Sequence, residues 1–145
     1  MAVDVLTEIE IARPRDEVAA FAADPANATR WYKNIRSVEW ETPPPAAVGS
    51  RMRFVAQFLG RTLEYTYEVR ESEPGRRFVM STAQGPFPME TTYAWEDAGP
   101  DRTRMSLRNR GEPSGFAKVS APLMVRAMRR ANEADLRRLK ALLES

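Results

Sequence analysis

Hydrophobic and polar residues alternate along most of the chain, and this period of two predicts strands with one buried face. The first such run covers residues 3–11. Two short helices are expected next, one beginning near Pro14 and one at the cap-like pair Asp24–Pro25. Six further strands are expected over residues 35–41, 50–58, 62–69, 77–84, 89–96 and 102–110. Because turn-forming residues separate these runs, the pattern indicates an antiparallel meander with one wet face.

The chain closes with a long apolar-faced helix, expected from Ser120, which can cap it, to Glu144. Its buried stripe is mainly methionine, alanine and leucine, with Asp135 near the centre and Asn132 beside it. A long helix that follows a meander of curled strands can lie across the concave face of the sheet. Large side chains would then line the space between helix and sheet, so the order of elements suggests a container for a small molecule.

The composition excludes several kinds of chemistry. The chain has 145 residues, the size of one ordinary domain, so a single domain over residues 1–145 is expected. It contains no cysteine and no histidine, which excludes thiol nucleophiles, disulfides, a Ser-His-Asp triad and histidine-held zinc or haem. We therefore expect no metal and no cofactor, and a general base would have to be Asp, Glu, Tyr or Lys.

Charge and hydropathy give little reason to expect a nucleic-acid or membrane partner. Lysine and arginine number 22 against 20 acidic residues, so the net charge is only +2. No apolar run is long enough to span a bilayer, and residues 1–4 lack the features of a signal peptide. We expect a cytoplasmic protein, a monomer or a dimer, that neither inserts into membranes nor binds nucleic acid.

Several short stretches resemble the START/Bet v1-like (SRPBCC) superfamily, in its polyketide cyclase/dehydrase and lipid-transport branch. They are residues 14–21, 24–31, Val48-Gly49-Ser50, Glu73-Pro74-Gly75, Tyr93-Ala94-Trp95-Glu96 and residues 135–140. The resemblance covers essentially the whole chain. Its motifs are caps, turns and core positions, so they indicate a fold more clearly than an activity.

The resemblance implies an α+β protein with a helix-grip fold. In this fold a seven-stranded curled antiparallel sheet surrounds a long C-terminal helix, with two short helices between strands 1 and 2. Members of the superfamily bind lipids, sterols, polyketides or plant hormones, some cyclise or dehydrate polyketides, and others activate partner proteins. Analogy at the level of the fold does not choose among these activities.

Large side chains expected to face the last helix, together with residues on that helix and the second short helix, are the predicted ligand-binding residues. They are Trp31, Phe54, Phe58, Tyr65, Tyr67, Met80, Met89, Tyr93, Trp95, Met105, Asn109, Met124, Met128 and Asn132. Such a set can instead fill a solid core. Buried tyrosine hydroxyls need partners, methionine adapts to ligands of different shape, and the resemblance favours an open space. We therefore expect a cavity of about 300–1,000 Å³, with Trp31 and Tyr32 near its mouth.

Asp135 allows two interpretations. A carboxylate buried alone is costly, so it is expected to be paired, protonated or at a rim. Asp135 then makes either a structural hydrogen bond or ion pair, or it serves as a ligand anchor or acid/base group with Asn132 and Asn109 as partners. Tyr65 and Tyr93 are the other catalytic candidates.

Two further features each have a structural and a functional interpretation. The arginine row at residues 102, 104, 108 and 110 invites a phosphate-binding interpretation. In the strand order that the resemblance implies, these arginines face acidic residues on the first and sixth strands, so cross-strand charge pairing is expected. The segment of residues 115–123 is either a gate over the cavity or an ordinary connector.

These observations predict a protein that binds an apolar or aromatic small molecule, such as a lipid or polyketide, as a carrier, sensor or sequestering protein. One alternative is an enzyme similar to polyketide cyclases and dehydrases that uses aspartate and tyrosine in the cavity. Another is a partner-binding or chaperone-activating module, which predicts a filled core and an exposed apolar patch.

Overall fold

The secondary structure follows the predicted order in the computed structural model, which describes residues 3–85, 88–112 and 121–145. The strands are β1 (Val3–Ile11), β2 (Ile35–Trp40), β3 (Arg51–Phe58), β4 (Arg61–Glu73), β5 (Arg77–Gln84), β6 (Met89–Gly99) and β7 (Arg102–Gly111). The helices are α1 (Arg15–Ala22), the 3₁₀ helix η1 (Pro25–Asn27), α2 (Ala28–Trp31) and α3 (Ala121–Glu144).

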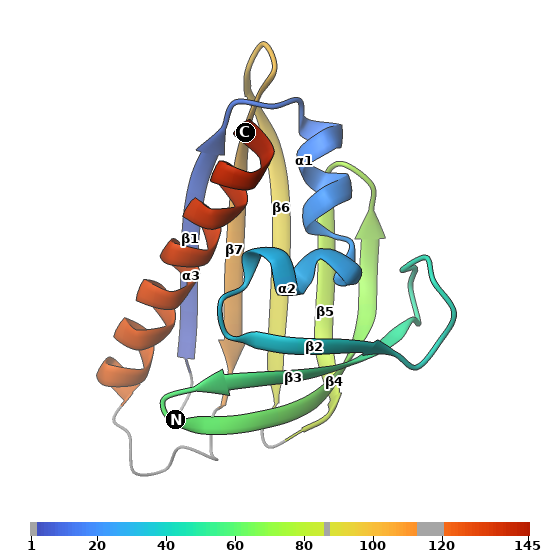
Figure 1. Cartoon of the computed structure of the whole chain (residues 1–145), viewed down its shortest axis with the longest axis vertical. Coiled ribbons are helices and arrows are strands. Elements are labelled where there is room, and N and C mark those ends of the chain that lie inside the picture. The colour runs from blue at the N-terminus through green and yellow to red at the C-terminus, as the bar shows by residue number, and fades with distance from the viewer. Residues whose placement is uncertain (1–2, 86–87, 113–120) are drawn as a thin grey trace.

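All seven strands form one antiparallel sheet in the order β1-β7-β6-β5-β4-β3-β2. Figure 1 shows the sheet curling, so that β2 and β3 run at a steep angle to β6 and β7. Helix α3 packs mainly against β1 on the concave side, and α1 and α2 lie on the same side. The chain therefore has the helix-grip fold, with short helices between β1 and β2 as predicted.

The short helices begin where the sequence signals predict. Oδ1 of Asp24 accepts a hydrogen bond from the N–H of Ala26 at 3.0 Å, and Pro25 takes the first helical position of η1. A side-chain acceptor at this position satisfies a backbone donor that the helix leaves free. Helix α2 then ends at Trp31, whose side chain is completely buried. The segment thus directs residues that follow α2 toward the concave face.

Charge pairs on the convex face agree with the predicted role of the arginine row. The guanidinium of Arg108 donates two hydrogen bonds to Asp4 of β1, at 2.8 and 2.6 Å, and these bonds lower the pKa of the Asp4 carboxyl. Arg110 lies 3.2 Å from Glu90 of β6. Because β7 lies between β1 and β6, its exposed arginines form charge pairs with acidic residues on both neighbouring strands.

Strand β4 departs most from the simple alternation. It continues to Glu73 rather than ending near residue 69, and its pairing with β5 is irregular between Thr66 and Tyr67 and between Val69 and Glu71. Thr66, expected on the outward face, is buried together with Tyr67. Irregularities of this kind bend a strand and increase its twist. They allow β4 to follow the curl of the sheet over its 13 residues.

The long helix buries the predicted stripe, which includes Met124, Met128, Asp135 and Leu139. The predicted cap at Ser120, and the predicted gate up to that residue, lie outside the described residues. Among the residues that are described, no helix is long and apolar enough to cross a membrane.

Candidate functional site

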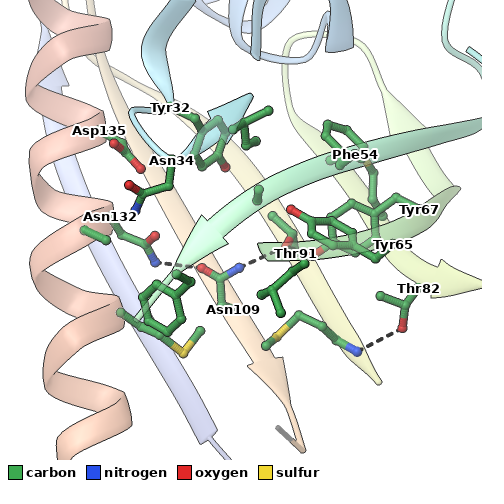
Figure 2. A pocket seen from close by; sticks show the side chains of 18 of the residues that line it. Tyr32, Asn34, Phe54, Tyr65, Tyr67, Thr82, Thr91, Asn109, Asn132 and Asp135 are labelled. Carbon is green, nitrogen blue, oxygen red and sulfur yellow. Dashed lines mark hydrogen bonds between the residues drawn. The ribbon is translucent and has the colours of Figure 1, made fainter. Parts of the chain in front are cut away.

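A cavity of about 160 Å³ lies between the concave face of the sheet and α3. Figure 2 shows Asn132 and Asp135 projecting from α3 on one side, and the rings of Phe54, Tyr65 and Tyr67 on the other. The volume is below the predicted range, because methionine and aromatic side chains occupy much of the space. An engineered apolar cavity of about 150 Å³ binds benzene. The cavity therefore suits a ligand built around about one ring.

Most of the residues singled out from the sequence line this cavity. They are Phe54, Phe58, Tyr65, Tyr67, Met80, Met89, Tyr93, Asn109, Met124, Met128, Asn132 and Asp135. Those from the sheet lie on β3, β4, β5, β6 and β7, at positions that alternate toward the concave face. The period of two thus brings together side chains that are far apart in the sequence.

Three of the predicted ligand-binding residues lie in the hydrophobic core instead of the cavity lining. Trp31 and Met105 have no exposed surface, and Trp95 is 4% exposed. Trp31 does not lie at a mouth, contrary to prediction, because α2 turns its indole inward. Its ring centroid lies 4.0 Å from that of Tyr32 and 5.7 Å from that of Tyr93. Tyr32 itself lines the cavity.

The lining also includes residues that the sequence did not single out. They are Asn34, Ile35, Ala56, Gln57, Leu63, Thr82, Thr91 and Ala131. Leu63 and Thr91 share the alternation of Tyr65 and Tyr93, so strand parity could have identified them. Asn34 precedes β2, and no pattern in the sequence marks it.

A hydrogen-bonded chain of polar side chains crosses the cavity lining from α3 to β4 (Figure 2). Nδ2 of Asn132 donates to Oδ1 of Asn109 at 2.6 Å, and Nδ2 of Asn109 donates to Oγ1 of Thr91 at 2.9 Å. The hydroxyls of Thr91 and Tyr67 are 2.7 Å apart. Burial raises the pKa of Tyr67 to about 12, although the hydrogen bond with Thr91 lowers it. This hydrogen-bonded network therefore links α3, β7, β6 and β4 through uncharged side chains.

The Thr91→Val variant is expected to lower the free energy of unfolding by about 1–3 kcal/mol. Valine keeps the shape of the side chain but leaves the Asn109 amide and the Tyr67 hydroxyl without this partner. Denaturant unfolding measures the loss. Thr92→Val, one residue away on the opposite face, is the matched control and should cost less than half as much. Equal losses in the two variants would contradict a special role for Thr91.

Asp135 is a nearly isolated carboxylate in this lining. It is 4% exposed, and its Oδ1 accepts a hydrogen bond from the backbone N–H of Lys33 at 3.1 Å. Oδ2 has no hydrogen-bond partner among the described residues. Burial raises the pKa of Asp135 to about 6, against the lowering effects of the Lys33 hydrogen bond and the nearby charges of Arg138 and Lys33. The group can therefore gain or lose a proton near neutral pH.

The tyrosine hydroxyls stay neutral at physiological pH. Those of Tyr32 and Tyr93 are 2.7 Å apart, and burial raises the pKa of both, with a further increase from the charge of Asp135. Burial likewise raises the pKa of Tyr65 well above its ordinary value. In the described part of the chain, the Tyr65 hydroxyl makes no hydrogen bond. It is a polar group in the cavity lining that a ligand can bind.

A second, wider groove of about 860 Å³ lies between α1, the loop after β2 and the turn between β4 and β5. Its walls include exposed residues such as Asp24, Pro44, Pro45 and Glu73. The smaller cavity is the better candidate site, because ligand sites combine an apolar lining with a few converging buried polar groups. Across residues 3–85, 88–112 and 121–145, no three acidic side chains gather as a metal site would require.

Solved structures with similar folds cover nearly the whole chain. A START superfamily protein from Mycobacterium smegmatis is 17% identical with a TM-score of 0.81, and the match covers 97% of each chain. The Zhui aromatase/cyclase from a Streptomyces species is 17% identical with a TM-score of 0.81, covering 99% of this chain and 94% of that one. Major latex-like protein 151 from Panax ginseng is 11% identical with a TM-score of 0.77, covering 97% and 96%. At these identities the likeness shows the fold alone.

The sequence itself places the chain in a family. No curated protein matches it. Residues 2–144, however, match the family described as polyketide cyclase / dehydrase and lipid transport. That match spans almost all of the chain and agrees with the START-like fold and the cavity beneath α3. The chain therefore belongs to the polyketide cyclase/dehydrase and lipid transport family.

Proposed function

We propose that this protein binds a compact apolar or aromatic small molecule between the sheet and α3, as a carrier, sensor or sequestering protein. One observation carries the proposal: rings and methionines surround a space of about 160 Å³ onto which a few buried polar groups converge. The Tyr65 hydroxyl and Oδ2 of Asp135 have no hydrogen-bond partner among the described residues, so both are available to a ligand. The family and the fold support ligand binding or cyclase activity in general terms.

Native mass spectrometry of the protein as purified is the first test. We expect a stoichiometric companion molecule, which extraction and identification would assign to a chemical class. A protein that carries no companion, and gains none on incubation with a panel of one- and two-ring aromatic compounds, would contradict the proposal.

The Ala56→Leu variant is expected to weaken binding of any such ligand at least tenfold. Ala56 is 7% exposed and faces the cavity from β3, so the larger side chain occupies space that the ligand needs. Isothermal titration calorimetry measures the affinity. Val55→Leu, which adds a single carbon at the next position on the opposite face of β3, is the control and should leave affinity within about threefold. Unchanged binding by Ala56→Leu would place the ligand elsewhere.

Acid–base catalysis is the second candidate function. It is favoured by one observation, a carboxyl of pKa about 6 in the lining of an aromatic cavity. Solvent deuterium exchange into a ring-bearing ketone such as 1-phenyl-2-propanone distinguishes the two candidates. An enzyme accelerates the exchange and loses that acceleration in Asp135→Asn while still binding the ketone, whereas a carrier binds without acceleration. The cavity argues against a partner-binding module, which predicted a filled interior.

A further inference from the structure

The cavity has an unusual balance of charge. Among its lining residues in the described part of the chain, Asp135 is the only side chain that is ionised at neutral pH. No lysine or arginine side chain is among those residues. The four tyrosines have raised pKa values and stay neutral. At neutral pH the described lining therefore presents one negative charge and no positive one.

Asp135 is also incompletely satisfied. The residue is only 4% exposed, and among the described residues Oδ1 has a single backbone donor while Oδ2 has none. No lysine or arginine in the described residues forms an ion pair with it. A buried carboxylate normally needs a counter-charge or several hydrogen bonds, and removing it from water without them is costly. The missing partner can come from the ligand.

We propose that the ligand of this cavity carries a protonated amine on a ring-sized apolar body, and that the ammonium pairs with Asp135. This inference rests on the proposed binding function and names the class of ligand. The ammonium would donate to Oδ2, and the adjacent tyrosine rings would favour it through their electron-rich faces. Tyr32 and Tyr93 lie near enough for the Asp135 charge to raise the pKa of each.

The same arrangement disfavours anionic ligands. A carboxylate or phosphate in this cavity would add a second negative charge beside Asp135, with no positive side chain from the described lining to offset it. Free fatty acids and aromatic acids are therefore expected to bind poorly. A neutral ligand avoids this repulsion but leaves Oδ2 without a charged partner.

A series of three compounds with one ring and a short chain tests the inference. 2-Phenylethylamine, 2-phenylethanol and phenylacetate differ mainly in charge and match a cavity that holds about one ring. We expect the amine to bind at least tenfold more tightly than the alcohol at pH 7.5, and phenylacetate to bind most weakly. Isothermal titration calorimetry or ligand-observed NMR measures the affinities.

Two variants test whether Asp135 is the residue that recognises the amine. In Asp135→Asn, the preference for the amine over the alcohol should fall to within about threefold, while the affinity for the alcohol changes little. Glu133→Gln removes an exposed acid two residues away on the same helix and should keep the full preference. If Asp135→Asn fails to fold, the three compounds on the wild-type protein still decide the question.

The outcomes separate this inference from the proposed function. If 2-phenylethanol binds at least as tightly as the amine, or if the amine keeps its advantage in Asp135→Asn, the amine inference is wrong while ligand binding stands. If none of the three compounds binds and no companion is found in the purified protein, ligand binding itself is contradicted.

Discussion

The Asp135→Asn variant is expected to gain about 2–3 kcal/mol of stability relative to the wild type as the pH rises from 4 to 8. Burial raises the pKa of Asp135 from 3.8 to about 6 in the folded protein. A group whose pKa is raised on folding makes its full contribution to stability at pH values below its pKa in the unfolded state. That contribution is lost as the pH rises through about 6. Asparagine has no proton to lose and so escapes the penalty.

Urea unfolding of both proteins at several pH values between 4 and 8 measures this gain. Subtracting the unfolding free energy of the wild type from that of the variant at each pH cancels the contributions of other carboxyls. Asp4 and Glu144, whose pKa values are lowered, are two of these. Glu133→Gln is the control and should show no comparable rise. A flat difference for Asp135→Asn would mean that the carboxylate is solvated in the folded protein, and it would remove the physical basis for an ammonium partner.

The faces of the strands could be predicted from the sequence because a sheet repeats every two residues. Alternation assigned Tyr93 on β6 and Leu107 on β7 to the buried side, and both are less than 5% exposed. It failed at Thr66, because the register between β4 and β5 shifts there. A shift of this kind depends on how two strands pair, and the hydrophobic pattern of one strand does not contain that information.

The central polar group of the site was predictable, but its surroundings were not. Helical periodicity placed Asp135 on the buried stripe of α3, and it is 4% exposed. Among the described residues, its one hydrogen-bond donor is the backbone of Lys33, which is 102 residues away in the sequence. That contact depends on how the segment after α2 packs against α3. The cavity volume depends in the same way on side-chain packing, so it could not be read from residue types.

Trp31 shows why short helices are difficult to orient from sequence. Helix α2 has only four residues, so it offers little more than one turn of periodicity. The sequence predicts Trp31 near a cavity mouth, whereas the structure places it in the core with no exposed surface. Its neighbour Tyr32 contributes to the cavity lining instead.

Truncating Trp31 is expected to have the largest effect on stability of the changes considered. Trp31→Ala should lower the free energy of unfolding by about 3–5 kcal/mol, because it removes a completely buried ring and leaves a void against Tyr32 and Tyr93. Trp31→Phe should cost less than half as much. It keeps a ring and removes a buried indole N–H that has no hydrogen-bond partner among the described residues. Denaturant unfolding measures both losses, with Trp40→Ala, a half-buried tryptophan, as the control for a smaller loss.

Ligand affinity gives the second measurement for Trp31. If the indole supports the cavity only by packing behind Tyr32 and Tyr93, then Trp31→Phe should bind the tightest compound of the charge series within about threefold of the wild type. A tenfold or larger loss of affinity in a folded Trp31→Phe protein would instead mean that the indole contacts the ligand. In that case the cavity must open toward the core when it fills, and the original prediction that Trp31 binds ligand would hold for the occupied protein.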